Sequence, residues 1–489
     1  MDSVSKWLNE IDRTIENGKY KDDWESLSTY PVAEWYAAAK FGIFIHWGAY
    51  SVPAYKTEWY PRQMYYRSNP VYAHHKKTYG TDFPYRMFID MFTAPLFDAD
   101  KWMRAIKNSG ARFVMPVAEH HDGYKMYSSR LSRWTTEKQA MHRDVLGELK
   151  EAAERYGLEF ATSSHRAEHY WFMNGAATLD TVTEERDPEY ADLYGPLAHV
   201  NTKNDLKAML DGEKNIVPSR EWMEEWLAHT AELVTNYRPS GIYFDWWVHH
   251  PAFRPYMKKF MAYYYNKSAE WGKEVVVQYK NDAAMYGSAI YDRERGQMDS
   301  VMPRIWQSDT ATSKNAWCHT TTNRYKTPAE IARAMADVLS KNGVFVLNIG
   351  PKADGTLAPE DENILASLGE WTRANRNALF GAVPYRITGE GKKFKLKGFK
   401  ENLNYSSRDF RYTYRPCHIY AFALKPNKSG VYKLTKLNRD RDNFAFTIKS
   451  VTLLASGEKL EWKHTRNALT IKTAPPSSPM PLVLDIEID

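Results

Sequence analysis

The feature that most constrains the fold is a repeat of short apolar segments, each preceded by a longer amphipathic segment. The apolar segments have the character of buried strands, and the segments before them have the period of helices. This alternation predicts a parallel sheet surrounded by helices. In 489 residues it favours a (β/α)8-like TIM barrel over an open doubly wound sheet, and no Gly-x-Gly-x-x-Gly or P-loop motif supports nucleotide binding. The expected strands are 41–47, 112–117, 158–162, 242–244, 275–278 and 344–348, and the clearest helices are 32–40, 219–237, 252–270 and 328–341.

The pattern changes near residue 383. A helix is expected over 359–377 and a linker over 380–385, and beyond them polar and apolar residues alternate. This alternation, clearest over 444–448 and 482–488, is typical of half-buried antiparallel strands. About a hundred such residues predict a β-sandwich. We therefore expect a barrel with an N-terminal extension over 1–382 and a β-sandwich over 383–489.

Composition argues against several classes of partner. The net charge of +6 is spread without a basic block, so nucleic acid is not expected as a partner. No run of roughly 18 apolar residues predicts a membrane span, and two cysteines give no disulfide framework. The first ten residues lack the apolar core of a signal peptide, so a cytoplasmic location is expected. The 17 Trp and 33 Tyr suit either a large aromatic core or a site that stacks on sugar rings.

One expected strand ends in an acid among aromatic residues. Asp245 follows Ile242-Tyr243-Phe244 and precedes two tryptophans. Burial of a carboxylate there costs several kcal/mol unless the group is paired or takes part in chemistry. Parallel barrels carry their active sites at the carboxyl ends of their strands. The alternative is that Asp245 caps the following turn or helix.

Four other polar clusters lie where barrel strands are expected to end, or just beyond. Each has an ordinary structural explanation, such as a turn or a solvated charge run, but all converge on one face of the predicted barrel. The clusters are His46-Trp47-Gly48, Glu58-Trp59-Tyr60, Glu119-His120-His121-Asp122-Gly123 and Tyr291-Asp292-Arg293-Glu294-Arg295-Gly296.

Two chemistries use such a set. A metal site would draw on His120 and His121, or on His165 and His169. Against it, no His-Glu-x-x-His motif occurs, and adjacent histidines on a strand point to opposite faces. Glycoside hydrolysis needs one ionised carboxylate, a second with a raised pKa, donors for the sugar hydroxyls and aromatic surface for the ring. Asp245 and the clusters around it supply that set.

At this point the motifs resemble those of glycoside hydrolase family 29, the α-L-fucosidases. They occur in the family's order between about residues 30 and 385, so the resemblance covers the barrel. The C-terminal region is consistent with the family's β-sandwich but carries no motif of its own. The resembling segments are 41–48, 58–60, 119–123, 243–245, 305–310, 340–343 and 347–352.

The resemblance implies a retaining exo-α-L-fucosidase with no metal or organic cofactor. Asp245 matches the family's nucleophile, Glu294 looks like the acid/base, and Asp292 is the reserve candidate for that role. The two carboxyl groups of a retaining enzyme lie roughly 5–5.5 Å apart. The residues implied to bind substrate are His46, Glu58, Trp59, His120, His121, Tyr243, Trp246 and Lys280.

The chain departs from the family in the wall of the expected sugar pocket. Tyr243 stands where some members have Trp, and Lys280 stands near a position where some have Arg. Ser163-Ser164-His165 occupies a place where some have tyrosines. An aromatic pocket around the C6 methyl of fucose would exclude hexoses with a bulkier C6. These departures concern the pocket wall and not the nucleophile.

Three other functions stay open. They are a related retaining glycosidase such as an α-L-galactosidase, whose sugar differs from fucose only at C6, a catalytically degenerate carbohydrate-binding protein, and the metal hydrolase considered above. The expected partner is a fucosylated oligosaccharide or glycoconjugate, and a homo-oligomer is left open. The sequence defines neither the glycosidic linkage nor the aglycone.

Overall fold

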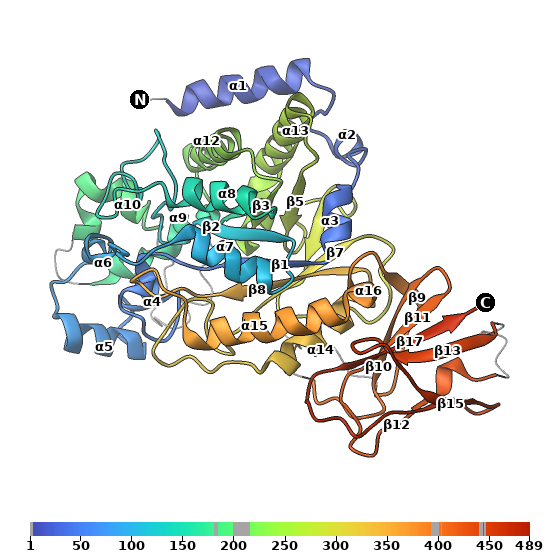
Figure 1. The fold of residues 1–489 in the computed structure, drawn as a ribbon. Helices are drawn as coiled ribbons and strands as arrows, with labels where there is room; N and C mark the ends of the chain where they lie inside the picture. The colour runs from blue at the N-terminus through green and yellow to red at the C-terminus, as the bar shows by residue number, and fades with distance from the viewer. Residues whose placement is uncertain are drawn as a thin grey trace.

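The computed structural model describes residues 3–179, 184–198, 216–392, 401, 403–439, 444 and 446–489. It contains a closed barrel of eight parallel strands, followed by antiparallel sheets that carry the C-terminus (Figure 1). Each barrel strand pairs with the next in sequence, and β1 closes the barrel onto β8. The predicted (β/α)8-like barrel is therefore confirmed. Its strands are β1 (Phe41–Ile45), β2 (Phe113–Glu119), β3 (Glu159–Ser164), β4 (Gly241–Phe244), β5 (Val276–Tyr279), β6 (Ile290–Asp292), β7 (Trp306–Ala311) and β8 (Gly343–Ile349).

Two barrel strands, β6 and β7, are absent from the predicted set. Residues 280–305 are all described and contain no helix, so the alternation of strand and helix gives no sign of β6 or β7. β6 has only three residues, and four of the six residues of β7, Gln307 to Thr310, are polar. The pattern therefore misses both strands, because β6 is short, β7 is largely polar and no helix directly precedes either one.

Helices cover the outside of the barrel. Ser219 and Thr327 cap α12 (Arg220–Tyr237) and α14 (Pro328–Leu339) by accepting backbone hydrogen bonds, which explains why both helices begin at the predicted positions. The N-terminal helix α1 (Val4–Asn17) packs across α12 and α13 (Arg254–Trp271) at the top of Figure 1. The other helices are α2 (Trp24–Leu27), α3 (Glu34–Ala39), α4 (Tyr60–Gln63), α5 (Pro70–Tyr79), α6 (Arg86–Met91), α7 (Ala99–Asn108), α8 (Val145–Arg155), α9 (His169–Phe172), α10 (Ala191–Tyr194), α15 (Pro359–Ala374) and α16 (Arg376–Leu379).

The C-terminal part is built from a six-stranded and a three-stranded antiparallel sheet. Side chains of both sheets share one core, as the β-sandwich prediction requires. The six-stranded sheet has the order β14-β13-β17-β11-β10-β9, and the other has the order β12-β16-β15. The strands are β9 (Val383–Glu390), β10 (Phe410–Arg415), β11 (His418–Ala423), β12 (Val431–Leu434), β13 (Ile448–Leu453), β14 (Glu458–Lys459), β15 (Glu461–His464), β16 (Leu469–Lys472) and β17 (Leu482–Ile488).

The six-stranded sheet also packs on the barrel helices. Along β11, Ile419 and Ala421 face the sandwich core, whereas Tyr420 and Phe422 belong to the core of the barrel part. Asp337 of α14 is fully buried and accepts hydrogen bonds from Arg411 of β10 at 2.5 Å and from Lys341 at 2.6 Å. Apolar contacts and a buried ion pair thus join the two parts.

Two boundaries in the C-terminal region differ from the prediction. The expected strand over 444–448 begins only at Ile448, where β13 pairs with β17. Phe444 is buried and packs its ring edge-on against His464, whereas Phe446 is 44% exposed, so the two do not share a buried face. The expected linker over 380–385 includes the start of β9, because Val383 pairs with Tyr414 in β10.

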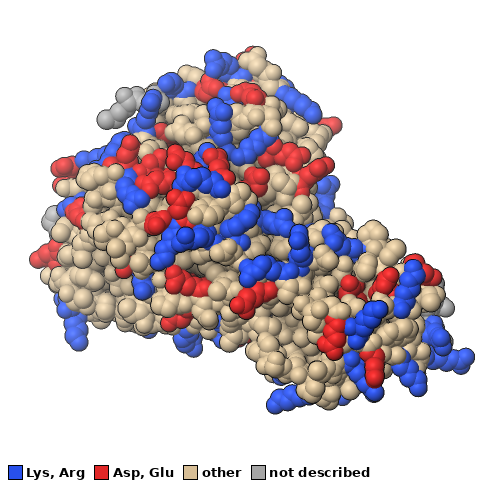
Figure 2. Space-filling view, in the orientation of Figure 1, with Lys and Arg blue, Asp and Glu red and all other residues tan. Residues whose placement is uncertain are grey.

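The charges of the molecule are mixed. On the face drawn in Figure 2, Lys and Arg side chains lie among Asp and Glu side chains over both parts of the fold. Among the described residues, no helix combines the length and apolar character that a membrane crossing needs.

Candidate active site

A cavity of about 640 Å³ opens at the carboxyl end of the barrel strands. All ten residues that the sequence analysis assigned to catalysis or substrate binding line it: His46, Glu58, Trp59, His120, His121, Tyr243, Asp245, Trp246, Lys280 and Glu294. They lie at or beyond the carboxyl ends of five different strands, and they meet because a closed parallel barrel places all these ends on one face.

Asp245 follows β4 directly and does not act as a cap. The short helix after it, Trp246–His249, receives no side-chain capping bond, which removes the alternative explanation for this acid. Its carboxylate lies 3.0 Å from Lys280 Nζ and 3.3 Å from His165 Nδ1. Burial alone would raise the pKa of Asp245, but Lys280 and the neighbouring imidazoles hold it well below its usual range. Asp245 is therefore an ionised carboxylate at neutral pH.

Lys280 joins Asp245 to Glu294. The same ammonium nitrogen lies 3.0 Å from Asp245 Oδ1 and 2.6 Å from Glu294 Oε2, so these two oxygens are at most 5.6 Å apart, the sum of the two distances. Lys280 follows β5 and Glu294 lies two residues beyond β6. The Glu294 side chain is 24% exposed, and the carboxyl group thus borders both the cavity and solvent.

Asp292, the reserve candidate for the acid/base, is held differently. It is 2% exposed and accepts a 2.8 Å hydrogen bond from Gln307 Nε2. Burial and the nearby charge of Asp309 raise its pKa well above the usual range. Both residues line the cavity. Asp292 is the last residue of β6 and is held in the barrel wall, whereas Glu294 lies two residues beyond the strand and is partly exposed.

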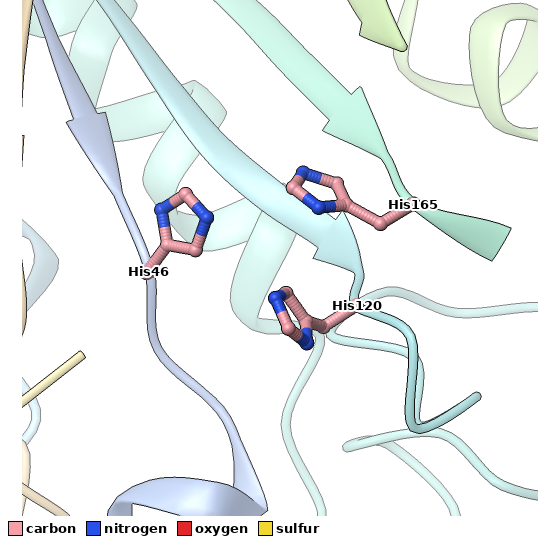
Figure 3. Close-up of side chains that lie close together, drawn as sticks. All are labelled: His46, His120 and His165. Carbon is pink, nitrogen blue, oxygen red and sulfur yellow. The ribbon is translucent and has the colours of Figure 1, made fainter. Parts of the chain in front are cut away.

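Four histidines from three strand ends surround Asp245. His46 follows β1, His120 and His121 follow β2, and His165 follows β3; Figure 3 shows His46, His120 and His165 extending toward a common space. The expectation that His120 and His121 point to opposite faces is wrong. Both lie beyond the last residue of β2, where the strand's alternation has ended, and their ring centroids are 4.2 Å apart.

Burial keeps three of these imidazoles, those of His46, His120 and His121, neutral. It lowers the pKa of His121 to about 3, with a further contribution from His165, and it lowers the pKa values of His46 and His120 well below the usual range. His169, considered as a possible metal ligand together with His165, does not line the cavity. Its Nδ1 lies 2.7 Å from the backbone oxygen of His121, and its ring packs against Gly123, whose φ of +80° lets the chain turn away from the site.

Glu58 and Trp59 come from the loop after β1. Glu58 is buried, accepts a 2.8 Å hydrogen bond from the backbone N–H of Trp317, and has a pKa raised by that burial. The rings of Trp59 and Trp246 are nearly parallel, with 9° between their planes and 6.4 Å between their centroids. A buried polar acceptor and two parallel aromatic rings therefore line the same cavity.

Eight further residues line the cavity beside the ten predicted to act in catalysis or substrate binding. Tyr243 donates a 3.1 Å hydrogen bond from its hydroxyl to Asp309, and burial raises the pKa of Asp309 to about 6. The polar run in β7 is a signal that could have identified Asp309. The sequence suggests His165 as a metal ligand and as part of the pocket wall, but not its contact with Asp245. The additional lining residues are Phe44, His165, Asn281, Tyr291, Asp292, Arg293, Asp309 and Trp317.

A residue from the C-terminal part supports the loops around the cavity. Glu401 lies 2.9 Å from both Arg295 and Lys326, on the loops after β6 and β7. The guanidinium of Arg295 in turn lies 4.8 Å from the ring centroid of Trp317, which lines the cavity.

Among the described residues, two groups of three cavity side chains could each hold a metal ion. In each group, one possible ligand atom from every residue lies within 4.8 Å of the other two. One is His46, His120 and His165, and the other is His121, His165 and Asp245. Both groups share His165 and border the carboxylate pair.

The site as a whole combines ionised and buried acids, neutral imidazoles and flat aromatic surface in one pocket. On this fold, that combination defines a barrel glycoside hydrolase.

Comparison with known proteins identifies the family. A family model described as α-L-fucosidase matches residues 8–377, and the chain belongs to this family. Rat tissue α-L-fucosidase is 27% identical over 450 residues, which cover 91% of this chain and 86% of the rat protein. Human tissue α-L-fucosidase is 25% identical over 471 residues, covering 94% and 89%.

Solved structures of the family share the fold. The crystal structure of Thermotoga maritima α-fucosidase in complex with fucose matches with a TM-score of 0.74 at 25% identity, covering 96% of this chain and 100% of that one. A complex of an α-fucosidase from the same organism with a mechanism-based inhibitor gives a TM-score of 0.75 at 25% identity.

Proposed function

We propose that this chain is a retaining exo-α-L-fucosidase that removes terminal α-L-fucosyl residues from fucosylated oligosaccharides or glycoconjugates. The observation that carries the proposal is the pair of carboxylates joined by Lys280. The two oxygens bound to Lys280 are at most 5.6 Å apart, which is less than the roughly 6.5–9.5 Å between the carboxyl groups of inverting glycosidases and leaves the roughly 5–5.5 Å of retaining ones within reach. A larger gap would leave room for a water between acid and sugar and would favour inversion.

In the first step Asp245 attacks the anomeric carbon. A bond forms between that carbon and Asp245, the bond to the leaving oxygen breaks, and Glu294 gives its proton to that oxygen. In the second step Glu294 takes a proton from water, whose oxygen attacks the same carbon and releases Asp245. Two inversions return the sugar with its original configuration. Lys280 favours the ionised state of Asp245 that the attack requires.

The remaining cavity residues suit the binding of one sugar ring. Neutral imidazoles of His46, His120 and His121 donate and accept hydrogen bonds, and Glu58 adds a buried acceptor. Trp59, Tyr243 and Trp246 add flat apolar surface for the ring and its methyl group. An α-L-galactosidase is the alternative, because its substrate differs from fucose only by a hydroxyl at C6.

Hydrolysis of an aryl α-L-fucoside, followed by proton NMR, tests the proposal. We expect α-L-fucose as the first anomer formed, with much slower turnover of the matching aryl α-L-galactoside. First appearance of the β anomer would overturn the retaining mechanism. Faster cleavage of the galactoside would favour the alternative, and binding without turnover would indicate a degenerate carbohydrate-binding protein. Defined fucosylated oligosaccharides, assayed in parallel, would identify the linkage.

A further inference from the structure

Three imidazoles in the cavity lie closer together than the binding of a sugar ring requires. This histidine cluster, His46, His120 and His165, places one nitrogen of each residue within 4.8 Å of the others. The ring centroids are 5.0 to 5.7 Å apart, and Figure 3 shows the three side chains approaching from separate strand ends. All three residues are buried. Imidazole nitrogens gathered from different strands are a ligand set that Zn²⁺ and Cu²⁺ prefer.

The hydrogen bonds around His46 leave one of its nitrogens with a free lone pair. Asn348 Nδ2 donates to the backbone oxygen of Trp317 at 2.6 Å, so the Asn348 side-chain oxygen faces His46 Nδ1, also at 2.6 Å. An amide oxygen only accepts, and Nδ1 of His46 must therefore carry the proton. The lone pair then resides on Nε2. In metal sites, a histidine that binds the ion through one nitrogen commonly donates a hydrogen bond from the other, as Nδ1 of His46 does here.

The other two histidines also have nitrogen atoms to offer. His120 Nδ1 is buried and makes no hydrogen bond to any part of the chain that the structure describes. His165 Nε2 lies 3.1 Å from the hydroxyl of Ser163, and its Nδ1 lies 3.3 Å from Asp245 Oδ2. The Asp245 carboxylate is thus adjacent to the cluster and provides an oxygen donor beside the three nitrogens.

We propose that the histidine cluster binds a divalent transition metal ion of the zinc type, and that this ion inhibits the enzyme by occupying the sugar pocket and engaging Asp245. In a tetrahedral site with Zn–N distances of about 2.0–2.1 Å the donors are about 3.4 Å apart. Small rotations of the rings must therefore close the cluster around the ion. Hard ions such as Mg²⁺ and Ca²⁺ prefer oxygen ligands and are not expected to bind.

The ion is inhibitory because the same atoms cannot serve metal and sugar together. An oxygen of Asp245 bound to the ion is no longer free to attack the anomeric carbon. His46 and His120 would hold the ion in place of sugar hydroxyls. The competition with sugar rests on the proposed function, whereas binding of the ion itself depends only on the side chains.

Binding of Co²⁺, followed by visible absorption, tests the proposal without an activity assay. We expect the full-length chain, first cleared of metal with a chelator, to bind one Co²⁺ with the visible absorption of a tetrahedral ion, and Zn²⁺ to displace it. L-Fucose should release the ion in a concentration-dependent way. Absence of any tight Co²⁺ or Zn²⁺ binding would overturn the inference, and so would binding that saturating fucose leaves unchanged in a chain that hydrolyses the fucoside.

Variants locate the ion. His165→Phe and His165→Gln should each weaken Zn²⁺ binding by roughly tenfold or more, as the loss of a ligand predicts. His418→Ala is the matched control, because His418 lies in β11 of the C-terminal sheet and should leave binding unchanged. Thermal unfolding checks that each variant is folded. Equal affinity in a folded His165 variant would place the ion elsewhere and refute the proposed cluster.

Kinetics with an aryl α-L-fucoside separate this inference from the proposed function. If Zn²⁺ raises KM without lowering kcat, both are supported. An active enzyme that Zn²⁺ does not inhibit competitively contradicts the metal inference alone. A chain that binds Co²⁺ at the histidine cluster but does not hydrolyse the fucoside contradicts the proposed function alone.

Discussion

The ammonium of Lys280 lies 3.0 Å from the carboxylate of Asp245. Lysine presents one compact point charge, whereas arginine presents a planar fork of donors. One nitrogen therefore has to serve two acids here, since Glu294 is 2.6 Å from the same atom. The nucleophile and the acid/base of the proposed mechanism thus share one cation, which holds the two side chains close together.

Replacement of Lys280 should shift the pH dependence of activity. Burial favours the protonated form of Asp245 and Lys280 opposes it, so Lys280→Met should raise the pKa of this carboxylate. Since attack requires the ionised form, the acidic limb of the kcat/KM profile should move to higher pH. Lys280→Arg keeps the charge and should leave that limb nearly in place. An unshifted acidic limb in Lys280→Met would contradict the assignment.

Asp245→Asn should remove turnover while the fold persists. The amide cannot form the glycosyl-enzyme bond, and we expect kcat on an aryl α-L-fucoside to fall by at least about 10³-fold, as for other nucleophile replacements. Far-UV circular dichroism and the thermal midpoint should show an intact barrel. Near-normal activity in this variant would refute the mechanism.

Glu294→Ala tests the acid/base. Without its carboxyl group, protonation of a poor leaving group and activation of water should both fail, while azide, which needs no base, should restore part of the turnover of an activated fucoside. Asp292→Ala is the matched comparison, because Asp292 is buried and bound to Gln307. Azide rescue in Asp292→Ala but not in Glu294→Ala would reverse the assignment.

Asp122 should make stability depend on pH. This buried acid accepts a 2.5 Å hydrogen bond from Tyr85, and burial raises its pKa to about 7. Above about pH 4 the unfolded chain has released this proton and the native protein still holds it, so unfolding becomes easier as pH rises toward 7. Relative to Asp122→Asn, the wild type should lose about 2–3 kcal/mol of unfolding free energy between about pH 5 and pH 7.5. Denaturant titrations at both pH values measure the unfolding free energies. Equal losses of unfolding free energy in the wild type and in Asp122→Asn would contradict the role of Asp122.

Asp337 should be important for stability at the contact between the barrel and the C-terminal sheet. Asp337→Ala leaves two cations, Arg411 and Lys341, without their shared buried carboxylate, which should cost about 3–5 kcal/mol. Glu461→Ala is the control, because its ion pair with Lys472 is exposed and should contribute less than about 1 kcal/mol. Denaturant midpoints of both variants give the comparison. Equal midpoints would mean that this contact adds little.

The fold was predictable where local pattern and burial agree. A helix precedes each of β1 to β5 and β8, so the alternation of helix and strand in the sequence reveals them. β6 and β7 were not predicted, because β6 is short, β7 is polar and no helix directly precedes either strand. The gathering of the site residues also followed from the sequence, since parallel strands share one carboxyl edge.

Individual contacts within the site were less predictable. The pairing of Lys280 with both acids depends on the register of β4, β5 and β6, which no local pattern specifies. His120 and His121 face one cavity because β2 ends one residue before them, and element ends are the least certain part of any sequence prediction. The approach of His165 to Asp245 requires the closed barrel.

Glu401 comes from the part of the chain after the barrel, yet its partners Arg295 and Lys326 belong to the rim of the pocket. A protein cut after residue 382 would keep every lining residue of the cavity and lose the anion that holds Arg295 beside Trp317. Transplanting the barrel alone into a chimera would therefore carry over the catalytic groups without their support. For engineering purposes the smallest transferable unit of this enzyme extends into its C-terminal region.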